Sequence, residues 1–416
     1  MSNFDVCILG LGYIGLPTVA LLAQNDINVH GVDINEKIVN NINEGKIHII
    51  EPGLTEMLQE GLKKNLIHAS TTAKKSDIYL IVVPTPLQHD NAPDIAYVES
   101  AVRNIMPLLK EGDLLIIEST SPVGTTEKML KMIAEERKDL VIEGSSDLEL
   151  PKLKLHMAYC PERVLPGNVF HELVYNDRVI GGITPEDGEI ACKFYRNFVK
   201  GELFVTNSKT AEMCKLTENA SRDAQIAFAN ELSIICDKAD INVWELIELA
   251  NKHPRVNILN PGCGVGGHCI AVDPWFIAAQ YPLESRMISE ARNINNHKVF
   301  WCADQISKAI KIFKQQHNKQ PKVALMGLAF KPNIDDLRES PAKSIVSKVL
   351  QSENNMNIDI VEPNLSEHHI FKLTNYEEAY NNADIVAFLV GHDEFFSLEY
   401  CDNKEILDFC GIFKSK

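Results

Sequence analysis

A glycine motif close to the start of the chain constrains the fold more than any other feature. The apolar strand Asp5–Leu9 leads directly into Gly10-Leu-Gly-Tyr-Ile-Gly15. A helix follows through Ala23, and the next strand, Asn28–Val32, ends at Asp33. Glycines in such a strand–turn–helix unit let the backbone approach a pyrophosphate, and an acid about 20 residues further on binds the adenosine ribose. A glycine-rich turn without a ligand is the alternative, but the order of the elements favours a dinucleotide site.

The carboxylate of Asp33 also discriminates between cofactors. It accepts hydrogen bonds from the ribose hydroxyls of NAD and repels the 2′-phosphate of NADP. We therefore expect NAD, with Gly10, Gly12 and Gly15 forming the turn beneath it.

Length and composition exclude several classes of protein. A chain of 416 residues exceeds one ordinary core, so two or three domains are expected. The formal net charge of −16 argues against nucleic acid or a membrane surface as the main partner. The uncharged stretch between Asp5 and Asp26 is interrupted by glycine and proline, which favours a buried strand, turn and helix over a membrane segment. Ten scattered cysteines without a CxxC pair indicate reduced thiols and a cytoplasmic protein.

Further apolar strands end in polar residues. Asp77–Val83 and Leu114–Ile117 are two such strands, and a third leads into the segment His156–Gly167. Ligands of parallel sheets bind beyond the carboxyl ends of the strands. The side chains expected there, with helix capping or a surface ion pair as the alternative roles, are Thr85, Ser119, Thr120, Thr126, Glu162 and Arg163.

A single long helix is predicted from Ser208 to Ala239. Its apolar face is expected to contain Met213, Leu216, Ala220, Ala224, Ala227, Glu231 and Ile235, with Glu231 as the one polar break. On another face Lys215, Asn219 and Arg222 project together, either as a solvated stripe or toward a site. A helix of this length suits a connector between two α/β domains that also supplies a dimer surface.

The last part of the chain repeats the pattern of the first. Lys322–Phe330, Asn357–Asn364 and Ala383–Val390 resemble the first three strands, although Gly327 is not part of a full GxGxxG. The fold class is therefore α/β, with two doubly wound Rossmann-like domains joined by a central helical domain. The expected domain bounds are 1–200, 201–312 and 313–416. Lys331 and Arg338, just beyond the first strand of the last domain, suggest that this domain binds a nucleotide diphosphate.

A second glycine-rich segment, His253–Pro274, delivers a candidate nucleophile. Four glycines, Gly262, Gly264, Gly266 and Gly267, precede Cys269, and Asp273 follows it. A thiolate attacks carbonyl carbon, so thiol and dinucleotide together suggest a dehydrogenase with a covalent intermediate. A structural cysteine in a glycine-rich turn is the alternative.

Several motifs together resemble one known family. They are Gly10–Pro17, Cys160–Gly167, Ala211–Asn219, His253–Asn257, Gly266–Pro274 and Phe330–Ala342. On these motifs the chain resembles the UDP-glucose/GDP-mannose dehydrogenase family along essentially its whole length. Within the family it is most similar to the branch that oxidises UDP-N-acetyl-D-mannosamine for bacterial surface polysaccharides.

The resemblance implies a homodimer with NAD as oxidant. It also implies that residues 1–200 bind NAD, that 201–312 supply dimerisation and the catalytic loop, and that 313–416 bind a UDP-sugar. Cys269 is implied as the nucleophile and Lys215 as the catalytic lysine, with Asn219 beside them. Asp273, Glu162 and Thr120 are candidates for handling protons and water. The implied substrate contacts are Arg163, Val164, Lys215, Asn219, Arg222, His253, Arg255, Gly266, Phe330 and Lys331. The implied cofactor contacts beyond the glycines are Tyr13, Ile14, Asp33, Thr85, Thr126 and Arg338.

The expected reaction is a four-electron oxidation of the sugar C6 alcohol to a carboxylate, through a thiohemiacetal and a thioester on Cys269. The alternatives are a different UDP-hexose or UDP-N-acetylhexosamine, or a two-electron dehydrogenase with a structural cysteine. A Cys/His hydrolase, a zinc site at Cys263, His268 and Cys269, and a non-catalytic nucleotide-binding regulator are more distant ones. Two residues depart from the family pattern: Cys263 replaces a proline, and Cys410 stands where a basic residue is common.

Overall fold

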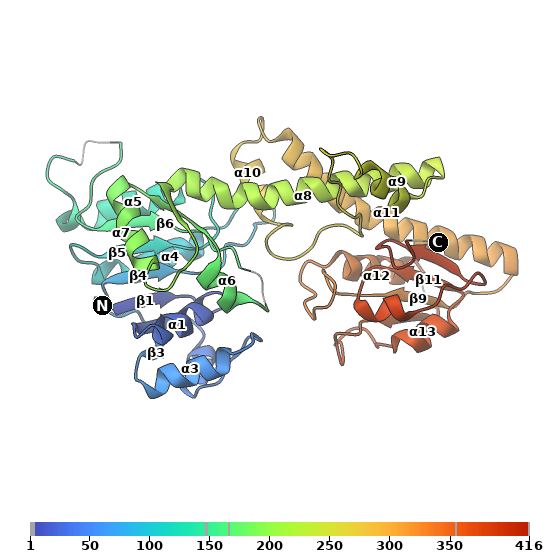
Figure 1. Ribbon diagram of the computed structural model, residues 1–416, viewed down its shortest axis with the longest axis horizontal. Coiled ribbons are helices and arrows are strands. Elements are labelled where there is room, and N and C mark those ends of the chain that lie inside the picture. The colour runs from blue at the N-terminus through green and yellow to red at the C-terminus, as the bar shows by residue number, and fades with distance from the viewer. Residues whose placement is uncertain (1–4, 146–148, 165–166, 354–355, 415–416) are drawn as a thin grey trace. The chain divides into compact units, whose positions relative to one another are not determined.

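The computed structural model describes residues 5–145, 149–164, 167–353 and 356–414. The chain forms two compact units, Met1–Thr217 and Glu218–Lys416, and each unit has its own β-sheet (Figure 1). Across the described ranges no helix combines the length and the apolar character that a membrane crossing requires.

The first unit is built on a sheet with the strand order β3-β2-β1-β4-β5-β6-β7-β8. Its strands are β1 (Asp5–Leu9), β2 (Asn28–Val32), β3 (Ile67–Ser70), β4 (Ile78–Ile81), β5 (Leu114–Ile117), β6 (His156–Tyr159), β7 (Arg178–Gly182) and β8 (Leu203–Asn207). Neighbouring strands are parallel except β6 and β7. From β3 to β6 the order is that of the dinucleotide-binding fold, in which ligands bind where the strand order reverses. In this sheet the reversal lies between β1 and β4.

Helices cover both faces of the first sheet because its strands are apolar on both sides. In β1, Val6 and Ile8 join one core with α1 and α3, whereas Cys7 and Leu9 join a second core with α4 and α5 (Figure 1). The helices are α1 (Gly15–Gln24), α2 (Glu36–Asn43), α3 (Leu54–Lys63), α4 (Ala96–Ile105), α5 (Thr125–Glu136), α6 (Val169–Tyr175) and α7 (Pro185–Tyr195), with 3₁₀ turns η1 (Met106–Leu108) and η2 (Lys138–Leu140).

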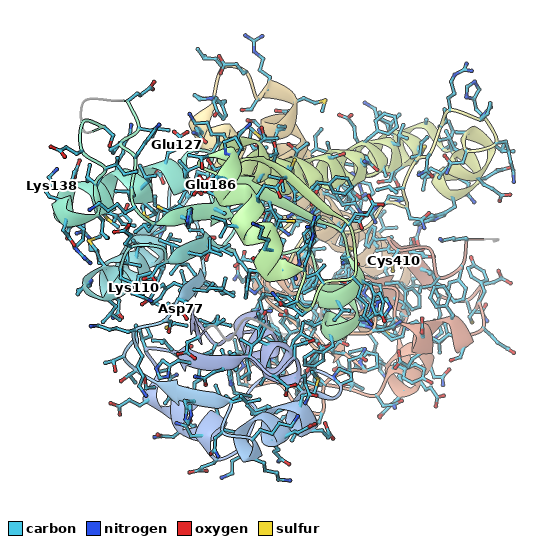
Figure 2. All side chains as sticks on the ribbon, turned by 60° about the vertical axis from the view of Figure 1, so that its left-hand side comes forward. Asp77, Lys110, Glu127, Lys138, Glu186 and Cys410 are labelled. Atoms are coloured by element: carbon cyan, nitrogen blue, oxygen red, sulfur yellow. The ribbon has the colours of Figure 1, made fainter. Side chains whose placement is uncertain are left out.

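Ion pairs join the amino-terminal ends of strands in the first sheet. Lys110 Nζ lies 2.8 Å from Asp77 Oδ1 and 3.0 Å from Asp113 Oδ1, and Figure 2 shows Asp77 and Lys110 beside one another. Asp77 Oδ2 also accepts a hydrogen bond from the backbone N–H of Asp5. These charges are thus occupied in holding strand starts together, at the edge opposite the predicted ligand site.

The second unit contains a smaller parallel sheet with the order β10-β9-β11-β12. Its strands are β9 (Val323–Met326), β10 (Ile358–Val361), β11 (Ile385–Phe388) and β12 (Glu405–Asp408). Its helices are the later part of α8 (Ser208–Ala239), then α9 (Val243–Ala250), α10 (Asp273–Gln280), α11 (Arg286–His317), α12 (Pro341–Ser352), α13 (Tyr376–Asn382) and the 3₁₀ turn η3 (Asp393–Ser397). Val323 and Leu325 pack toward α11 and α12, while Ala324 and Met326 pack toward α13.

The predicted fold class, α/β with two doubly wound sheets, is confirmed. The division into domains at residues 200 and 312 stays a prediction.

The bounds predicted for the long helix are confirmed by α8, but its predicted inward face is partly wrong. Glu231 is exposed and Ile235 is 54% exposed. The buried positions continue instead from Ala220 to Asp223, Ala227 and Asn230, and both polar side chains are fully buried. Asp223 and Asn230 are buried because α11 forms hydrogen bonds with their side chains. Apolar periodicity does not predict such hydrogen bonds.

Candidate functional site

The turn between β1 and α1 requires glycine at two positions. Gly10 has a φ of +100°, and a Cβ there would lie 2.2 Å from the carbonyl oxygen of Val82. A Cβ on Gly15 would lie 1.8 Å from the carbonyl oxygen of Gly10. At Gly12, by contrast, a Cβ would meet nothing within 4 Å, so the top of the turn faces open space. The turn is therefore tightly packed at Gly10 and Gly15 and open at Gly12, where a bound pyrophosphate needs space.

The end of β2 supplies the acid that the motif predicts. Asp33 Oδ2 accepts the backbone N–H of Leu11 at 3.1 Å, and Oδ1 accepts that of Asn35 at 2.9 Å. The carboxylate is thereby fixed beside the glycine turn. Ile14, at the N-cap of α1, supplies no side-chain hydrogen bond to the helix, which leaves this N-terminus suited to an anion. These residues fit NAD.

Polar side chains beyond β4 and β5 come together as predicted. The Thr85 hydroxyl donates to the carbonyl oxygen of Thr120 at 2.6 Å. The backbone N–H of Val83 donates to the Ser119 hydroxyl at 2.9 Å rather than to a neighbouring strand, and β4 already ends at Ile81. The loops after the two strands are therefore held against each other next to the reversal point.

Thr126 has a structural partner that the sequence did not reveal. Its hydroxyl and its backbone N–H both donate to Glu212 Oε1, at 2.7 and 2.8 Å, and Gly124 N–H donates to Oε2 at 2.5 Å. Burial raises the pKa of Glu212, while these hydrogen bonds oppose the rise. Glu212 thus caps the start of α5 and ties the first turn of α8 to it. A cofactor contact by Thr126 stays a prediction.

Glu162 lies beyond β6 in the same unit as Lys215. Burial raises the pKa of Glu162, and the nearby cations of Lys215 and Arg178 only partly offset the rise. Such a carboxyl can hold or release a proton closer to neutrality than an exposed one. Of its neighbours, Arg163 donates to the Asp177 carbonyl oxygen at 3.4 Å and Val164 packs on the apolar core. Leu165 and Pro166, in the same motif, lie outside the described residues.

In the second unit, residues 261–272 form the segment that we call the thiol loop. Cys269 is exposed and is not in a disulfide, whereas Cys263 at the start of the loop is buried. The backbone N–H of Asp273 donates to the Cys269 carbonyl oxygen at 2.8 Å, so Cys269 lies one turn before α10. The loop therefore presents one thiol and buries the other.

Close packing against the loop after β9 determines the path of the thiol loop. A Cβ on Gly266 would lie 2.4 Å from the Glu339 carbonyl oxygen and 2.9 Å from Phe330 Cβ. Gly267, with a φ of +83°, lies against the Phe330 ring. The structure thus brings Gly266 and Phe330, two predicted substrate contacts, into contact with each other.

Asn219 and Asp273 also meet. The Asn219 side-chain amide donates to Asp273 Oδ2 at 2.5 Å, and Asp273 is buried at the start of α10. Arg222, His253 and Arg255 are exposed, and the backbone N–H of Arg255 donates to His253 Nδ1 at 3.3 Å.

Two cations are predicted after β9, and they differ in their surroundings. Lys331 is half-buried next to Phe330. The Arg338 guanidinium binds both oxygens of Asp336, with Nε at 2.9 and 3.0 Å and Nη2 at 2.6 Å from Oδ2. A cofactor contact by Arg338 stays a prediction.

A buried pair that sequence reasoning missed occupies the reversal point of the second sheet. Glu362 Oε2 accepts the backbone N–H groups of Leu328 and Ala329, both at 2.8 Å, and lies 3.1 Å from His392 Nε2. His392 Nδ1 accepts from the backbone N–H of Asn333, so Nε2 carries the proton. Glu362 follows β10 as Asp33 follows β2, but it is only 3% exposed. The Glu362 carboxylate therefore forms its hydrogen bonds in the protein interior, whereas the Asp33 carboxylate is only partly buried.

The two residues that depart from the family pattern are both thiols in apolar surroundings. Burial raises the pKa of Cys263 and that of Cys410 well above the ordinary value. Cys410, labelled in Figure 2, donates to the Phe388 carbonyl oxygen at 3.4 Å. Within the part of the chain that the structure describes, no three His, Cys, Asp or Glu residues are grouped so that they could hold a metal ion.

Comparison with known proteins adds a family to this geometry. Three family models match, all described as UDP-glucose/GDP-mannose dehydrogenase family: the NAD binding domain at residues 4–199, the central domain at 209–297 and the UDP binding domain at 324–415. The UDP-N-acetyl-D-mannosamine dehydrogenase of Campylobacter jejuni is 52% identical over 419 residues, covering 99% of this chain and 100% of the relative. The NDP-N-acetyl-D-galactosaminuronic acid dehydrogenase of Ralstonia nicotianae is 47% identical, covering 99% and 96%. Among solved structures, the UDP-D-ManNAc dehydrogenase of Pyrococcus horikoshii has a TM-score of 0.86 at 37% identity, covering 99% and 96%.

Proposed function

Because this chain belongs to the UDP-glucose/GDP-mannose dehydrogenase family, we propose that it oxidises the C6 alcohol of UDP-N-acetyl-D-mannosamine to the carboxylate. Full-length similarity to the Campylobacter jejuni enzyme of that name supports the substrate. The observation that carries the mechanism is the exposed thiol of Cys269 on a tightly packed glycine loop, one helical turn before the buried Asp273. The product is a sugar acid for surface polysaccharides, in keeping with the branch of the family that the sequence resembles.

The reaction consumes two NAD, each of which would, when bound, supply the acceptor for one hydride. Asp33 and the glycine turn of β1–α1 hold its adenosine and pyrophosphate. The loops that carry Thr85 and Thr120 border the same reversal point and complete the edge of the cofactor site.

Cys269 performs the covalent step. Its thiolate adds to the C6 aldehyde left by the first oxidation and forms a thiohemiacetal, whose oxygen bears the developing charge. Loss of the second hydride leaves a thioester, and water then displaces the thiolate and yields the carboxylic acid. Lys215 and Asn219 stabilise the oxyanion at each tetrahedral stage, a role worth about 2.7–4 kcal/mol for a single donor.

We assign proton transfer to two acids, Glu162 and Asp273. The raised pKa of Glu162 suits a base that activates the attacking water, with Thr120 as a hydroxyl that orients it. Asp273, which accepts from Asn219 at 2.5 Å, fixes the orientation of that amide and takes part in proton handling. Arg163, Val164, Arg222, His253, Arg255, Gly266, Phe330 and Lys331 are the proposed substrate contacts.

The stoichiometry of NADH formation across a panel of UDP-sugars tests this function. We expect two NADH per sugar, with UDP-N-acetyl-D-mannosamine turned over far faster than UDP-glucose. One NADH per sugar would instead assign a two-electron dehydrogenase with a structural Cys269. Faster turnover of UDP-N-acetyl-D-galactosamine would favour the activity class of the Ralstonia relative.

We also propose a cytoplasmic homodimer. Apolar side chains are exposed on the second unit, including Phe228 (52%), Ile235 (54%) and Leu249 (62%) on α8 and α9, and a partner copy would cover them. The ten free cysteines fit a reducing compartment. Sedimentation equilibrium should give twice the chain mass, and a fully active monomer would refute the dimer.

A further inference from the structure

We infer that Asn230 is a positioning residue for the thiol loop, acting through a buried polar network between α8 and α11. The inference rests on the proposed role of Cys269. Asn230 lies outside the residues that the sequence motifs identify, and it is not proposed to contact substrate or cofactor. Its effect is exerted on the backbone of the loop.

Both ends of the Asn230 side-chain amide are in use. Its Oδ1 accepts the backbone N–H of Gly262, near the start of the thiol loop, at 2.8 Å. Its Nδ2 donates to Asn295 Oδ1 on α11 at 2.9 Å. Asn230 and Asn295 are both fully buried, so water is excluded as a substitute partner. Only a side chain with one acceptor and one donor at this length can serve the loop and α11 together.

A charged pair fixes the far end of the network. Asn295 Nδ2 donates to Asp223 Oδ1 at 2.7 Å, and Arg292 Nη1 donates to the same oxygen at 2.6 Å. Asp223 and Arg292 are at most 2% exposed. Because a buried ion pair tolerates few alternative arrangements, it holds the Asn295 amide in one orientation, and that orientation in turn presents Oδ1 to Asn230.

α8 holds the thiol loop at both of its ends. Asn230 binds Gly262 at the start, and Asn219 binds Asp273 just past the end. The two asparagines are 230 − 219 = 11 residues apart, which is close to three helical turns and about 16 Å along one face. Cys269 therefore lies on a segment suspended between two side chains of the same helix.

Loss of the hydrogen bond between Asn230 and Gly262 should displace the Cys269 thiol, although Cys269 itself is unchanged. In Asn230→Ala the Gly262 N–H and the Asn295 Oδ1 both lose their partner, so the start of the loop is released while Asn219 still holds its end. A misplacement of about 1 Å can lower a rate about 100-fold. We expect kcat to fall about 10- to 100-fold, with the Kd for NAD unchanged because the NAD site is formed by the first unit.

Ser233→Ala is the matched control. Ser233 lies on the same buried face of α8, and its hydroxyl bonds to the Asn230 backbone carbonyl at 2.6 Å and to Lys298 Nζ at 2.7 Å. Its loss costs buried hydrogen bonds of α8 and α11 but leaves the bond to Gly262 in place. We expect a comparable loss of Tm in the two variants, but a large loss of kcat and a changed rate of Cys269 alkylation by iodoacetamide only in Asn230→Ala.

The inference is overturned if Asn230→Ala keeps kcat and the alkylation rate within about twofold of Ser233→Ala. If Asn230→Ala does not fold, hydrogen exchange in the wild-type protein decides instead: the Gly262 amide should be among the slowest of the thiol loop, and rapid exchange would overturn the anchor. Normal acid formation by Cys269→Ala would refute the nucleophile while leaving the Gly262 exchange result valid. Failure of the proposed function and failure of the anchor are therefore distinguishable.

Discussion

Replacing Gly266 by alanine adds one methyl group at the tightest point of the thiol loop. The new Cβ would lie 2.4 Å from the Glu339 carbonyl oxygen, 2.7 Å from Pro341 Cδ and 2.9 Å from Phe330 Cβ. An ordinary contact needs 3.4–4 Å. Backbone and ring atoms cannot rotate away, so the loop must move outward by about 1 Å, at a cost of about 1–3 kcal/mol for overpacking. A shift of that size at Cys269 predicts a fall in kcat of about 100-fold.

Gly262→Ala is the control for this prediction. A Cβ on Gly262 meets nothing within 4 Å, and the backbone N–H that binds Asn230 is retained. We expect near-normal kcat and a slightly raised Tm, because alanine restricts the unfolded chain. Steady-state NADH formation and thermal unfolding measure both variants. The reasoning is refuted if Gly266→Ala keeps kcat within about threefold of Gly262→Ala, since the loop would then absorb the methyl without moving the thiol.

Three further predictions concern single charged or reactive groups. Asp33→Ala should narrow the preference for NAD over NADP, and equal kcat/KM for both cofactors in the wild type would contradict the assigned role of this carboxylate. Cys269→Ala should bind NAD and UDP-sugar normally by calorimetry but lose acid formation by several orders of magnitude; two NADH per sugar at a near-normal rate would mean that the thiol is structural. For Glu362, burial favours a raised pKa, but the hydrogen bonds from His392 and two backbone amides outweigh it and leave the pKa below the ordinary 4.5. A depressed pKa stabilises the fold above 4.5 and ceases to do so as the pH falls through the folded-state value. Glu362→Gln should therefore cost about 1–3 kcal/mol at pH 7 in denaturant unfolding and progressively less below pH 4.5, and a cost that does not shrink in acid would contradict this reading.

The sequence alone determined the elements whose causes are local. Backbone sterics at Gly10 and Gly15 dictate the turn after β1, because a Cβ would collide with carbonyl oxygens there. The bounds of β1, β2 and α8 follow from apolar spacing within each segment, and all three were predicted correctly. The position of Asp33 beside the glycine turn follows from the sequence because its distance from the glycine motif is a property of one βαβ unit.

Tertiary structure alone decided which polar and thiol groups are buried, because their partners lie far along the chain. Asn230 and Asp223 face inward on α8 since α11 supplies hydrogen bonds from residues 65 and 69 positions away. Thr126 is buried because Glu212, 86 residues later, accepts from it. Cys263 and Cys269 lie in the same glycine-rich loop, yet packing buries Cys263 and leaves Cys269 exposed. Apolar periodicity reflects the average free-energy cost of burying each residue type. The actual free-energy cost for a polar residue depends on a hydrogen-bond partner that only the folded chain brings within reach.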